Sequence, residues 1–293
     1  MSKPLLFFGT EDFSAQVFEA LIDRGYTFAA AVTKPDSKRG RRQQLTPPRV
    51  KTVALERGIP VWQPERLRDI AEAITSSGVE HGILVSYGKI IPASILDLFR
   101  GGIINLHPSL LPRYRGPSPI ETALKNGDAE TGVSIMRLTP RMDAGPVYAQ
   151  ATIPLTGTET RPELYTRCAE RGSELLIETL PSILDGTLAP RPQDEAAATY
   201  CRLLTKADGQ LDPSQKTAPE LEREIRAYLG FPKSRLSLRG QSIIALSSRV
   251  VNSKALDTLT VACRDTTWLE ITSLVAPSGR TMSGQDFLRG YGR

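Results

Sequence analysis

Short apolar runs alternate along the first two hundred residues with segments whose apolar side chains recur at helical spacing. The apolar runs are residues 4–9, 28–34, 59–62, 82–88 and 102–107, and the helical patterns are residues 15–25, 49–58, 66–78 and 92–101. This alternation predicts βαβ units and a mostly parallel, Rossmann-like sheet in an α/β domain. Ligands bind such sheets at the carboxyl ends of the strands, so we expect the turn after Gly9, the turn at Ser86–Gly88 and the strand end at Asn105–His107 to share one edge.

The pattern changes in the last third of the chain. Residues 187–204 combine Pro, Ala and acidic residues without a sustained period, and we interpret them as a linker. The later segments are a helical pattern at 219–230 and short alternating runs at 236–248, 259–265 and 268–276. Several short strands at this spacing predict a small OB-like β-barrel. We therefore expect an α/β domain at 1–186 and a β-barrel domain at 205–293, in line with roughly 150 residues per domain.

The composition is that of an ordinary globular protein. Hydrophobic residues make up 40% of the chain and charged residues 24%, without the bias of disordered, collagen-like or Cys-dense proteins. Cys168, Cys201 and Cys263 lie far apart and outside any CxxC spacing, so we expect free thiols in a reducing cytoplasm and neither a disulfide framework nor a zinc site. The apolar run Leu5–Phe8 is too short for a signal peptide or a membrane span, and we expect no membrane association.

Positive charge is concentrated in one Pro- and Gly-containing stretch, residues 34–51. This basic stretch carries seven basic side chains and one acid, Asp36, a net charge of +6, whereas the whole chain has +5. Its basic residues are Lys34, Lys38, Arg39, Arg41, Arg42, Arg49 and Lys51. Such a local excess is typical of a contact for a polyanion, but short basic runs also occur on ordinary solvated surfaces. Charge alone leaves these two interpretations open.

Asn105 and His107 are the first candidates for chemistry. They are two positions apart at a predicted strand end, so their side chains point to the same face. An amide can donate to an oxygen that gains negative charge, and an imidazole can give or take a proton, which together suit acyl chemistry. Asp143, with Gly145 close behind it, is the best candidate for a carboxylate that orients the imidazole. The other histidine, His81, lies at the entry to a predicted strand, and we interpret it as structural.

Several common motifs are absent from the sequence. The first turn, Gly9-Thr10-Glu11, lacks GxGxxG, and no GxxxxGK[ST] or GxSxG motif occurs. HExxH and paired Cys/His spacings are also missing. These absences disfavour dinucleotide binding, nucleoside triphosphate binding, serine hydrolase chemistry and a metal site.

Residues 105–116, NLHPSLLPRYRG, resemble the signature of formyltransferases that use 10-formyltetrahydrofolate, in which Asn, His and a later Asp form the catalytic set. Asp143, in LTPRMDAGP, stands where that family has its Asp. Similarity extends over nearly the whole chain, through FFGTEDFS, TKPDSKRGRRQQLTPPRVK, VWQPERLRD, SYGKIIP, NGDAETGVSIM, LTKADGQLD and RTMSGQDFLRG. The signature alone is shared by enzymes with different formyl acceptors, but the complete set most closely resembles the methionyl-tRNA formyltransferase family.

The resemblance implies a cytoplasmic, monomeric enzyme without a metal that transfers the formyl group of 10-formyltetrahydrofolate to the α-amine of methionyl-initiator tRNA. Asn105, His107 and Asp143 would be its catalytic residues, residues 1–186 its formyltransferase domain and residues 205–293 its tRNA-binding domain. The folate contacts implied are Ser86, Tyr87, Gly88, Lys89, Ile90, Ile91, Ser109, Leu110, Leu111, Pro112, Thr139 and Arg141. The tRNA contacts implied are Lys38, Arg39, Arg41, Arg42 and Arg49.

The sequence departs from the family pattern at several positions. Tyr114 and Pro117–Ser118 stand where the family commonly has Trp and Ala-Ala, and we expect little effect on the chemistry. Gln43 and Gln44 replace a usual Lys pair in the basic stretch, where neighbouring basic residues make up the lost charge. We therefore expect the stretch to contact tRNA through different residues.

Two segments of the signature keep more than one interpretation. Ser109–Pro112 is either an apolar turn that packs the strand end or, with the resemblance, a wall of the folate site. Arg113 and Arg115 would contact either the folate tail or the acceptor end of tRNA, and the sequence does not decide between them.

Three other functions stay open. A sugar-nucleotide N-formyltransferase would use the same folate and the same three residues, but we find no separate segment for a nucleotide diphosphate. A non-catalytic RNA-binding protein would use the basic stretch and the barrel, but would leave Asn105, His107 and Asp143 without a role. A hydrolase that releases formate resembles the first domain only, and it usually carries a regulatory domain ahead of a strand that here starts near Pro4.

Overall fold

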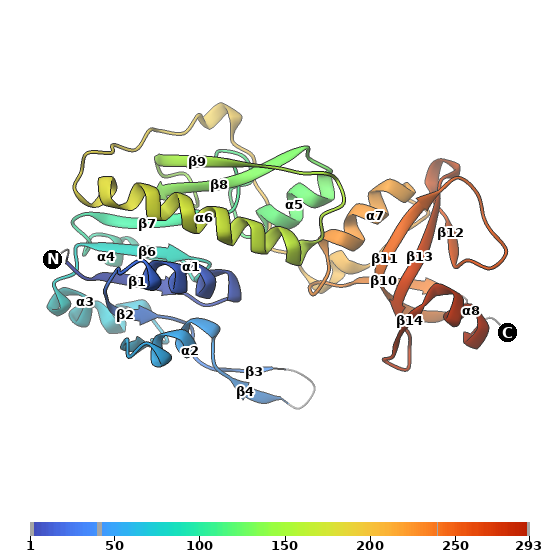
Figure 1. Ribbon diagram of the computed structural model, residues 1–293, viewed down its shortest axis with the longest axis horizontal. Coiled ribbons are helices and arrows are strands. Elements are labelled where there is room, and N and C mark those ends of the chain that lie inside the picture. Colours follow the sequence, from blue (N-terminus) through green and yellow to red (C-terminus); the bar gives the residue numbers. More distant parts are fainter. Residues whose placement is uncertain (1–2, 40–42, 239, 292–293) are drawn as a thin grey trace. The chain divides into compact units, whose positions relative to one another are not determined.

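The computed structural model describes residues 3–39, 43–238 and 240–291 (Figure 1). The chain divides into two compact units, each built from several segments. The first unit comprises Met1–Pro117, Thr131–Ile153 and Tyr165–Tyr200, and the second comprises Ser118–Glu130, Pro154–Leu164 and Cys201–Arg293.

A seven-stranded sheet forms the centre of the first unit. Its strands are β1 (Leu5–Gly9), β2 (Phe28–Val32), β5 (Val61–Trp62), β6 (His81–Val85), β7 (Gly102–His107), β8 (Glu130–Arg137) and β9 (Val147–Pro154), in the order β5-β2-β1-β6-β7-β8-β9. Neighbours from β5 to β7 pair in parallel, and β8 pairs antiparallel to β7. The expected mostly parallel sheet is therefore confirmed. Every residue of β1 and β7 is buried, as strands covered on both faces require.

Helices cover both faces of this sheet (Figure 1). The helical segments are α1 (Asp12–Asp23), α2 (Arg49–Glu56), η1 (Leu67–Ile70), α3 (Ala71–Ser77), α4 (Ala93–Leu96), α6 (Arg161–Leu184) and η2 (Glu195–Ala197). On one face, the ring of Phe7 stacks on Phe18 of α1 at 4.3 Å, and Leu106 lies against Gly172 of α6, where a Cβ would come within 2.5 Å. The other face packs on α3 and α4 through a buried cluster of Leu6, Phe8, Leu67, Ile74, Ile91, Ile95, Phe99 and Ile103.

The basic stretch contains a short antiparallel hairpin that the periodicity did not predict. Its strands are β3 (Ser37–Arg39) and β4 (Gln44–Thr46), which pair from Ser37↔Thr46 to Arg39↔Gln44. Strands of three residues are too short for an alternating pattern to identify them.

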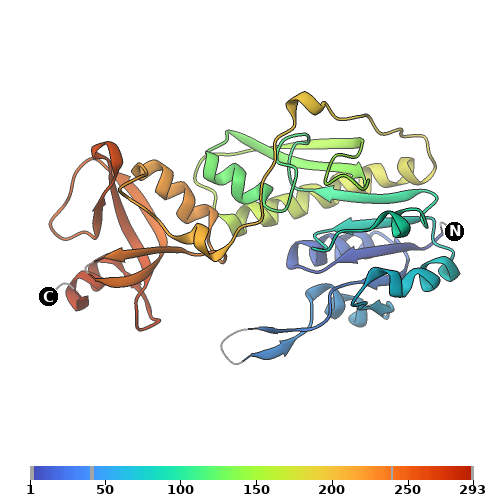
Figure 2. The same cartoon turned by 180° about the vertical axis from the view of Figure 1, so that it is seen from behind.

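The predicted linker packs on the first unit as far as Tyr200. The main chain of Arg191 exchanges two hydrogen bonds with that of Val147 in β9, so the segment runs beside this strand (Figures 1 and 2). Farther along, the N–H of Arg115 donates to the carbonyl of Thr199 at 2.9 Å. The absence of periodicity here reflects an extended segment whose bonds are made to distant parts of the unit.

The second unit has an antiparallel β core. Its elements are α5 (Pro119–Asn126), η3 (Lys206–Gly209), α7 (Ala218–Ala227), β10 (Ser234–Leu238), β11 (Gln241–Val251), β12 (Thr260–Ala262), η4 (Arg264–Thr266), β13 (Trp268–Val275), β14 (Thr281–Ser283) and α8 (Gly284–Tyr291). The strands pair in the order β10-β11-β13, and β12 and β14 share the other edge of β13. Leu221, Ile225, Leu269 and Phe287 form the buried centre. The expected class, an α/β unit plus a small antiparallel β unit, is confirmed.

Candidate active site

Strand β7 brings Asn105 and His107 to the edge where the parallel strands end. Asn105 pairs with Leu84 of β6, so the turn that begins at Ser86 lies next to the end of β7. Their side chains share a face with Ile103, whereas Leu106 points to the opposite face. Asn105 and His107 are 4% and 5% exposed. The strand therefore places an amide and an imidazole side by side in a buried setting, as the sequence predicts.

The His107 ring contacts two groups. Its Nε2 lies 3.0 Å from the carbonyl oxygen of Tyr114, and its Nδ1 lies 3.8 Å from Oδ2 of Asp143. Since a carbonyl oxygen only accepts, Nε2 carries a proton and donates to Tyr114. A second proton on Nδ1 would face the carboxylate.

Asp143 is held close to His107 by backbone geometry. Its Oδ2 accepts a hydrogen bond from the N–H of Gly116 at 2.8 Å, and its own φ is +49°. The loop then closes at Gly145, where a Cβ would lie 1.8 Å from the carbonyl oxygen of Arg137 in β8. Only a glycine fits this approach, which explains the Gly two positions after the Asp.

The side-chain amide of Asn105 makes no hydrogen bond within the described part of the chain, although the side chain is almost fully buried. The polar atoms of this amide are not among those that the protein encloses without a partner, so they reach solvent. An open amide at the end of a parallel strand indicates a ligand or water position. Its N–H groups are available to an oxygen of a bound molecule.

The turn after β6 presents main-chain groups at the same edge. Ser86 and Gly88 adopt φ values of +44° and +72°. Tyr87 between them points into the core at 1% exposure, and burial raises the pKa of its phenol to about 12, so the ring packs as a neutral group. The Lys89 ammonium donates to the carbonyls of Pro64 and Glu65, Ile90 is 89% exposed, and Ile91 is buried.

The turn at Ser109–Pro112 is held by bonds within the unit. The Ser109 hydroxyl donates to the Arg113 carbonyl at 2.6 Å, and the Leu111 N–H donates to the hydroxyl of Ser134 in β8. Leu110 packs over Gly132, where a Cβ would meet it at 2.4 Å. This turn therefore has the packing that the apolar-turn interpretation requires, and its side chains are largely committed to it.

Thr139 and Arg141 lie in the loop that leads from β8 to Asp143. The Thr139 hydroxyl donates to the Arg141 carbonyl at 3.2 Å. The Arg141 guanidinium is exposed and donates to Glu195 at 2.8 Å. Of the expected folate contacts in this loop, Arg141 is thus held by a residue of the predicted linker.

Arg115 is fully buried, with 0% exposure. Its guanidinium donates to Gln193 Oε1, to both carboxylate oxygens of Glu195 and to the hydroxyl of Tyr200. A side chain committed in this way does not extend to a folate tail or a tRNA end, so the expectation of such a contact for Arg115 is wrong. The sequence reasoning missed Gln193 and Glu195, because both lie in a segment without periodicity or motif.

The expected tRNA contacts occupy the hairpin and the start of α2. Lys38 is exposed on β3, Arg39 ends that strand, and Arg41 and Arg42 lie outside the described residues. Arg49, at the first position of α2, forms an ion pair with Glu19 at 3.6 Å. Lys38 is an exposed cation on a hairpin, which suits a contact with a polyanion.

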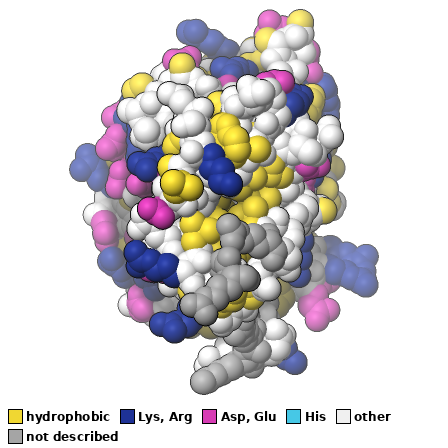
Figure 3. Space-filling model, turned by 90° about the vertical axis from the view of Figure 1, so that its right-hand side faces the viewer, with side chains coloured by type: hydrophobic (Ala, Val, Ile, Leu, Met, Phe, Trp, Pro, Cys, Tyr) yellow, Lys and Arg dark blue, Asp and Glu magenta, His cyan; other side chains and the backbone are white. Residues whose placement is uncertain are grey.

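The second unit offers a mixed surface. Phe231, Val250 and Leu256 are exposed apolar side chains there, Leu256 at 98%. Figure 3 shows hydrophobic side chains gathered near the middle of the face that it presents, with Lys and Arg side chains around them. This surface is therefore mixed in character and is not a simple basic patch.

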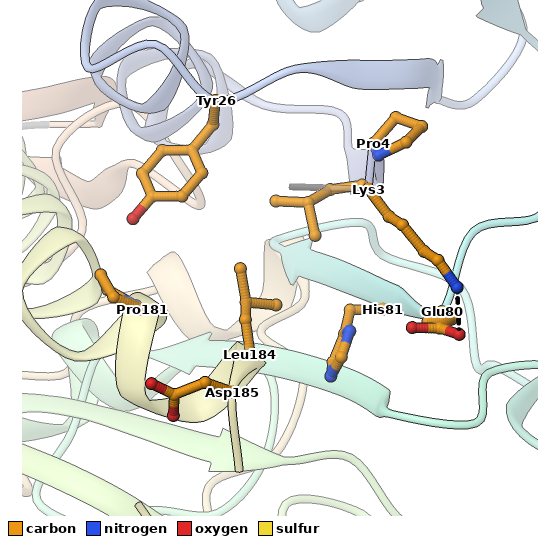
Figure 4. A pocket seen from close by; sticks show the side chains of 9 residues that line it. Lys3, Pro4, Tyr26, Glu80, His81, Pro181, Leu184 and Asp185 are labelled. Atoms are coloured by element: carbon orange, nitrogen blue, oxygen red, sulfur yellow. Dashed lines mark hydrogen bonds and ion pairs between the residues drawn. The ribbon is translucent and has the colours of Figure 1, made fainter. Parts of the chain in front are cut away.

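A separate cavity of about 500 Å³ lies at the opposite ends of the strands (Figure 4). Leu5 and His81, the first residues of β1 and β6, line it, whereas His107 is the last residue of β7. The His81 ring lies against Gly101, and burial lowers its pKa. Lys3 at the rim is paired with Glu80 at 2.6 Å. The cavity is therefore distinct from the site around Asn105.

The described part of the chain also bears on metal binding and on membrane insertion. Among them, no cluster of three or more His, Cys, Asp or Glu side chains is arranged to hold a metal ion. In the same residues, no helix combines the length and apolar character that a membrane span needs. All three cysteines are buried free thiols.

Comparison with known proteins covers both units. Residues 3–180 match the family model described as formyl transferase, and residues 203–292 match formyl transferase, C-terminal domain. Methionyl-tRNA formyltransferase of Pseudomonas putida (strain GB-1) is 37% identical over 293 residues, covering 96% of this chain and 94% of that protein. The protein of the same name from Halorhodospira halophila is 38% identical over 305 residues, covering 99% and 97%.

Solved structures share the fold at lower identity. HypX from Aquifex aeolicus in complex with tetrahydrofolic acid superposes with a TM-score of 0.70 at 16% identity, covering 98% of this chain and 47% of HypX, so the chain spans about half of that protein. An N-formyltransferase from Helicobacter canadensis in complex with folinic acid and dTDP-3-aminofucose gives a TM-score of 0.68 at 18% identity, covering 92% and 99%. These solved structures establish the fold. The identity of 37–38% with the two relatives extends through both units and beyond the segment around Asn105. The chain therefore belongs to the methionyl-tRNA formyltransferase family.

Proposed function

We propose that this protein transfers the formyl group of 10-formyltetrahydrofolate to the α-amine of methionyl-initiator tRNA. The observation that carries the proposal is the unpaired amide of Asn105 beside the His107–Asp143 pair, at the edge where parallel strands bind ligands. Family membership supplies the reaction class. The names of the relatives supply the acceptor.

The residues at this edge suit a formyl donor. Asn105 has free N–H groups for the formyl oxygen, and the Ser86–Gly88 turn presents main-chain groups next to it. We assign the flat pterin to main-chain groups of this turn, because the Tyr87 and Lys89 side chains are engaged elsewhere.

The reaction requires little activation of the nucleophile. An α-amine has a pKa of roughly 7.7 to 8.0, so a useful fraction is neutral at cellular pH. A C–N bond forms between this amine and the formyl carbon, and the bond from that carbon to the folate nitrogen breaks. One proton leaves the amine and one reaches the departing nitrogen, so the reaction is balanced without another reactant.

The three residues then have distinct roles. Asn105 donates to the oxygen that becomes negative in the tetrahedral intermediate. The His107 ring stabilises the same charge and passes a proton toward the leaving nitrogen once its Nε2–H turns from the Tyr114 carbonyl to the substrate. Asp143 holds the ring in place from the Nδ1 side. Replacing Asp143 by Asn preserves the shape of the side chain and removes its charge.

Lys38 and the rest of the basic stretch would contact the phosphates of tRNA. The hairpin of β3 and β4 projects beyond α2, whose Arg49 is paired with Glu19 (Figure 1). Lys and Arg contacts of this kind give affinity that falls steeply with salt.

The deciding assay is formyl transfer from 10-formyltetrahydrofolate to methionyl-initiator tRNA, run beside uncharged tRNA and an amino-sugar nucleotide. We expect formylation of the charged tRNA only, and a rate lower by about 10²-fold or more in Asp143→Asn with unchanged thermal unfolding. Transfer to the sugar nucleotide would replace the acceptor and keep the chemistry. Wild-type rates in Asp143→Asn would contradict the role of that residue.

We also propose that the protein works as a monomer in the cytoplasm. The buried free thiols suit a reducing compartment. Light scattering after size-exclusion chromatography should give a mass near 32.1 kDa, and a mass of twice this value would contradict the monomer.

A further inference from the structure

The loop that carries Asp143 is clamped by a side chain from the predicted linker. Gln193 Nε2 donates to the carbonyl oxygens of Asp143 and Gly145, at 2.8 and 2.7 Å. These bonds use both donors of the amide. The two carbonyls belong to the residues on either side of Ala144. One of these residues, Asp143, has a left-handed backbone conformation.

Arg115 fixes the other side of the same amide. Gln193 Oε1 accepts from Arg115 Nε at 3.0 Å and from Nη2 at 2.9 Å. The orientation of the amide is thereby determined, since an oxygen cannot face two carbonyls and an NH₂ group cannot face a guanidinium. Arg115 is itself anchored on Glu195, whose pKa is held at about 2 by hydrogen bonds from Arg115 and Arg141. The anchor is thus ionised at every pH at which the enzyme works.

The backbone around Arg115 reaches the catalytic pair from a second direction. Its neighbour Tyr114 offers the carbonyl that accepts from His107, and its neighbour Gly116 offers the N–H that binds the Asp143 carboxylate. Residues 114–116 are tied in turn to Thr199, whose hydroxyl accepts from Tyr114 and whose carbonyl accepts from Arg115. The Asp143 carboxylate and the Asp143 main chain are therefore held by hydrogen bonds from Gly116 and Gln193, whose segments are themselves bonded to each other.

A left-handed conformation at a non-glycine residue is strained, and it persists only where the surroundings hold it. Near Asp143, the main-chain bonds of Gln193 supply that hold. Asp143 Oδ2 lies 3.8 Å from the His107 ring, and the rate should be sensitive to any movement of this carboxylate. A displacement of about 1 Å at a reacting group costs on the order of 10²-fold in rate.

We infer that Gln193, anchored by Arg115, is a positioning residue that sets the Asp143 carboxylate against His107. The inference rests on the proposed function only for its kinetic readout. It assigns a catalytic purpose to a segment that connects the two family-matched regions, residues 3–180 and 203–292.

The test variant is Gln193→Glu. It keeps an acceptor for Arg115, with an added charge, but replaces the donors to the Asp143 and Gly145 carbonyls with an oxygen that they repel. The matched control is Asp194→Asn in the same segment, because that exposed side chain only caps η2 through the N–H of Ala196, a bond that Asn can also accept. If Gln193→Glu proves unfolded by circular dichroism, Gln193→Met removes the donors without adding charge.

We expect Gln193→Glu to lower kcat by roughly 10- to 100-fold, with KM for the folate nearly unchanged and with wild-type kinetics in Asp194→Asn. In an Asp143→Asn background the Gln193 substitution should cost almost nothing further, because it acts through that carboxylate. Equal losses in both backgrounds would overturn the inference and leave Gln193 a purely structural residue.

A second readout does not depend on formyl transfer. The chain has only two histidines, so the His107 ring can be identified in NMR spectra with the help of a His81→Gln variant. We expect its ring signals to move in Gln193→Glu in the direction seen for Asp143→Asn, and to stay in place in Asp194→Asn. Unmoved signals would refute the inference even in an active enzyme, whereas moved signals in a protein that formylates no tRNA would refute the proposed function alone.

Discussion

Gly145→Ala is the substitution whose effect the structure defines most sharply. The added Cβ would lie 1.8 Å from the carbonyl oxygen of Arg137, and real Cβ contacts are not found below 3.0 Å, so the two must separate by at least 1.2 Å. Arg137 belongs to β8 and pairs with Ile104 of β7, whereas Asp143 and Ala144, which precede the buried Gly145, are partly exposed. The loop should therefore yield, and the Asp143 carboxylate moves with it.

Two magnitudes follow for this variant. Steric overpacking of this kind typically destabilises a protein by about 1–3 kcal/mol. A displacement of about 1 Å at the orienting carboxylate should lower the rate of formyl transfer by roughly 10²-fold. The rate loss is thus expected at temperatures where the variant is fully folded.

The assay is single-turnover formylation of methionyl-tRNA, with urea unfolding measured on the same preparation. Gly290→Ala in α8 is the control, because a Cβ there meets no atom within 4 Å and Ala is the better helix former. A Gly145→Ala protein with wild-type kcat would show that the loop absorbs the added methyl group without moving Asp143, and the reasoning from this contact would be refuted.

Three further results are expected. Asn105→Ala should lower kcat by about 10²- to 10³-fold in the same assay, because it removes a donor to the oxyanion, and a loss below fivefold would contradict that role. Glu195→Gln should lower the melting temperature by a constant amount between pH 8 and 5. Because the pKa of Glu195 in the folded state, about 2, lies below the usual 4.5, the difference in melting temperature from wild type should shrink as the pH falls from 4.5 toward 2. A difference that grows in acid would refute the pairing. Lys38→Ala should weaken tRNA binding at low salt and reduce the slope of log affinity against log salt by about one unit, whereas Lys3→Ala, at the opposite ends of the strands, should leave the slope unchanged.

Local pattern was sufficient for the parallel sheet and for the placement of Asn105 and His107. Both residues lie in one buried strand, and strand periodicity alone puts them on the same face. The family resemblance of this motif also singled out Asp143, and the ring of His107 lies 3.8 Å from that carboxylate. What these residues do remains a prediction that the assays above decide.

Local pattern failed where the contacts join distant segments. Arg115 reads in the sequence as one more charge in an Arg-rich motif, yet it is buried against Gln193 and Glu195, about eighty positions away. Apart from the short η2 turn, residues 187–200 have no period because they bond to other elements, such as Val147 and Arg115.

By itself, the sequence determined the class of each unit, the strand that carries the reacting groups and the family signature, because these depend on hydrophobic periodicity and on residues close together in the chain. Only the tertiary structure decided which groups are free and which are committed: the amide of Asn105 is unpaired, the Ser109 hydroxyl is bonded to Arg113, and the Arg115 guanidinium is enclosed. The physical reason is that a polar side chain acquires its role from the partners that folding brings to it, and burial makes each such pairing obligatory.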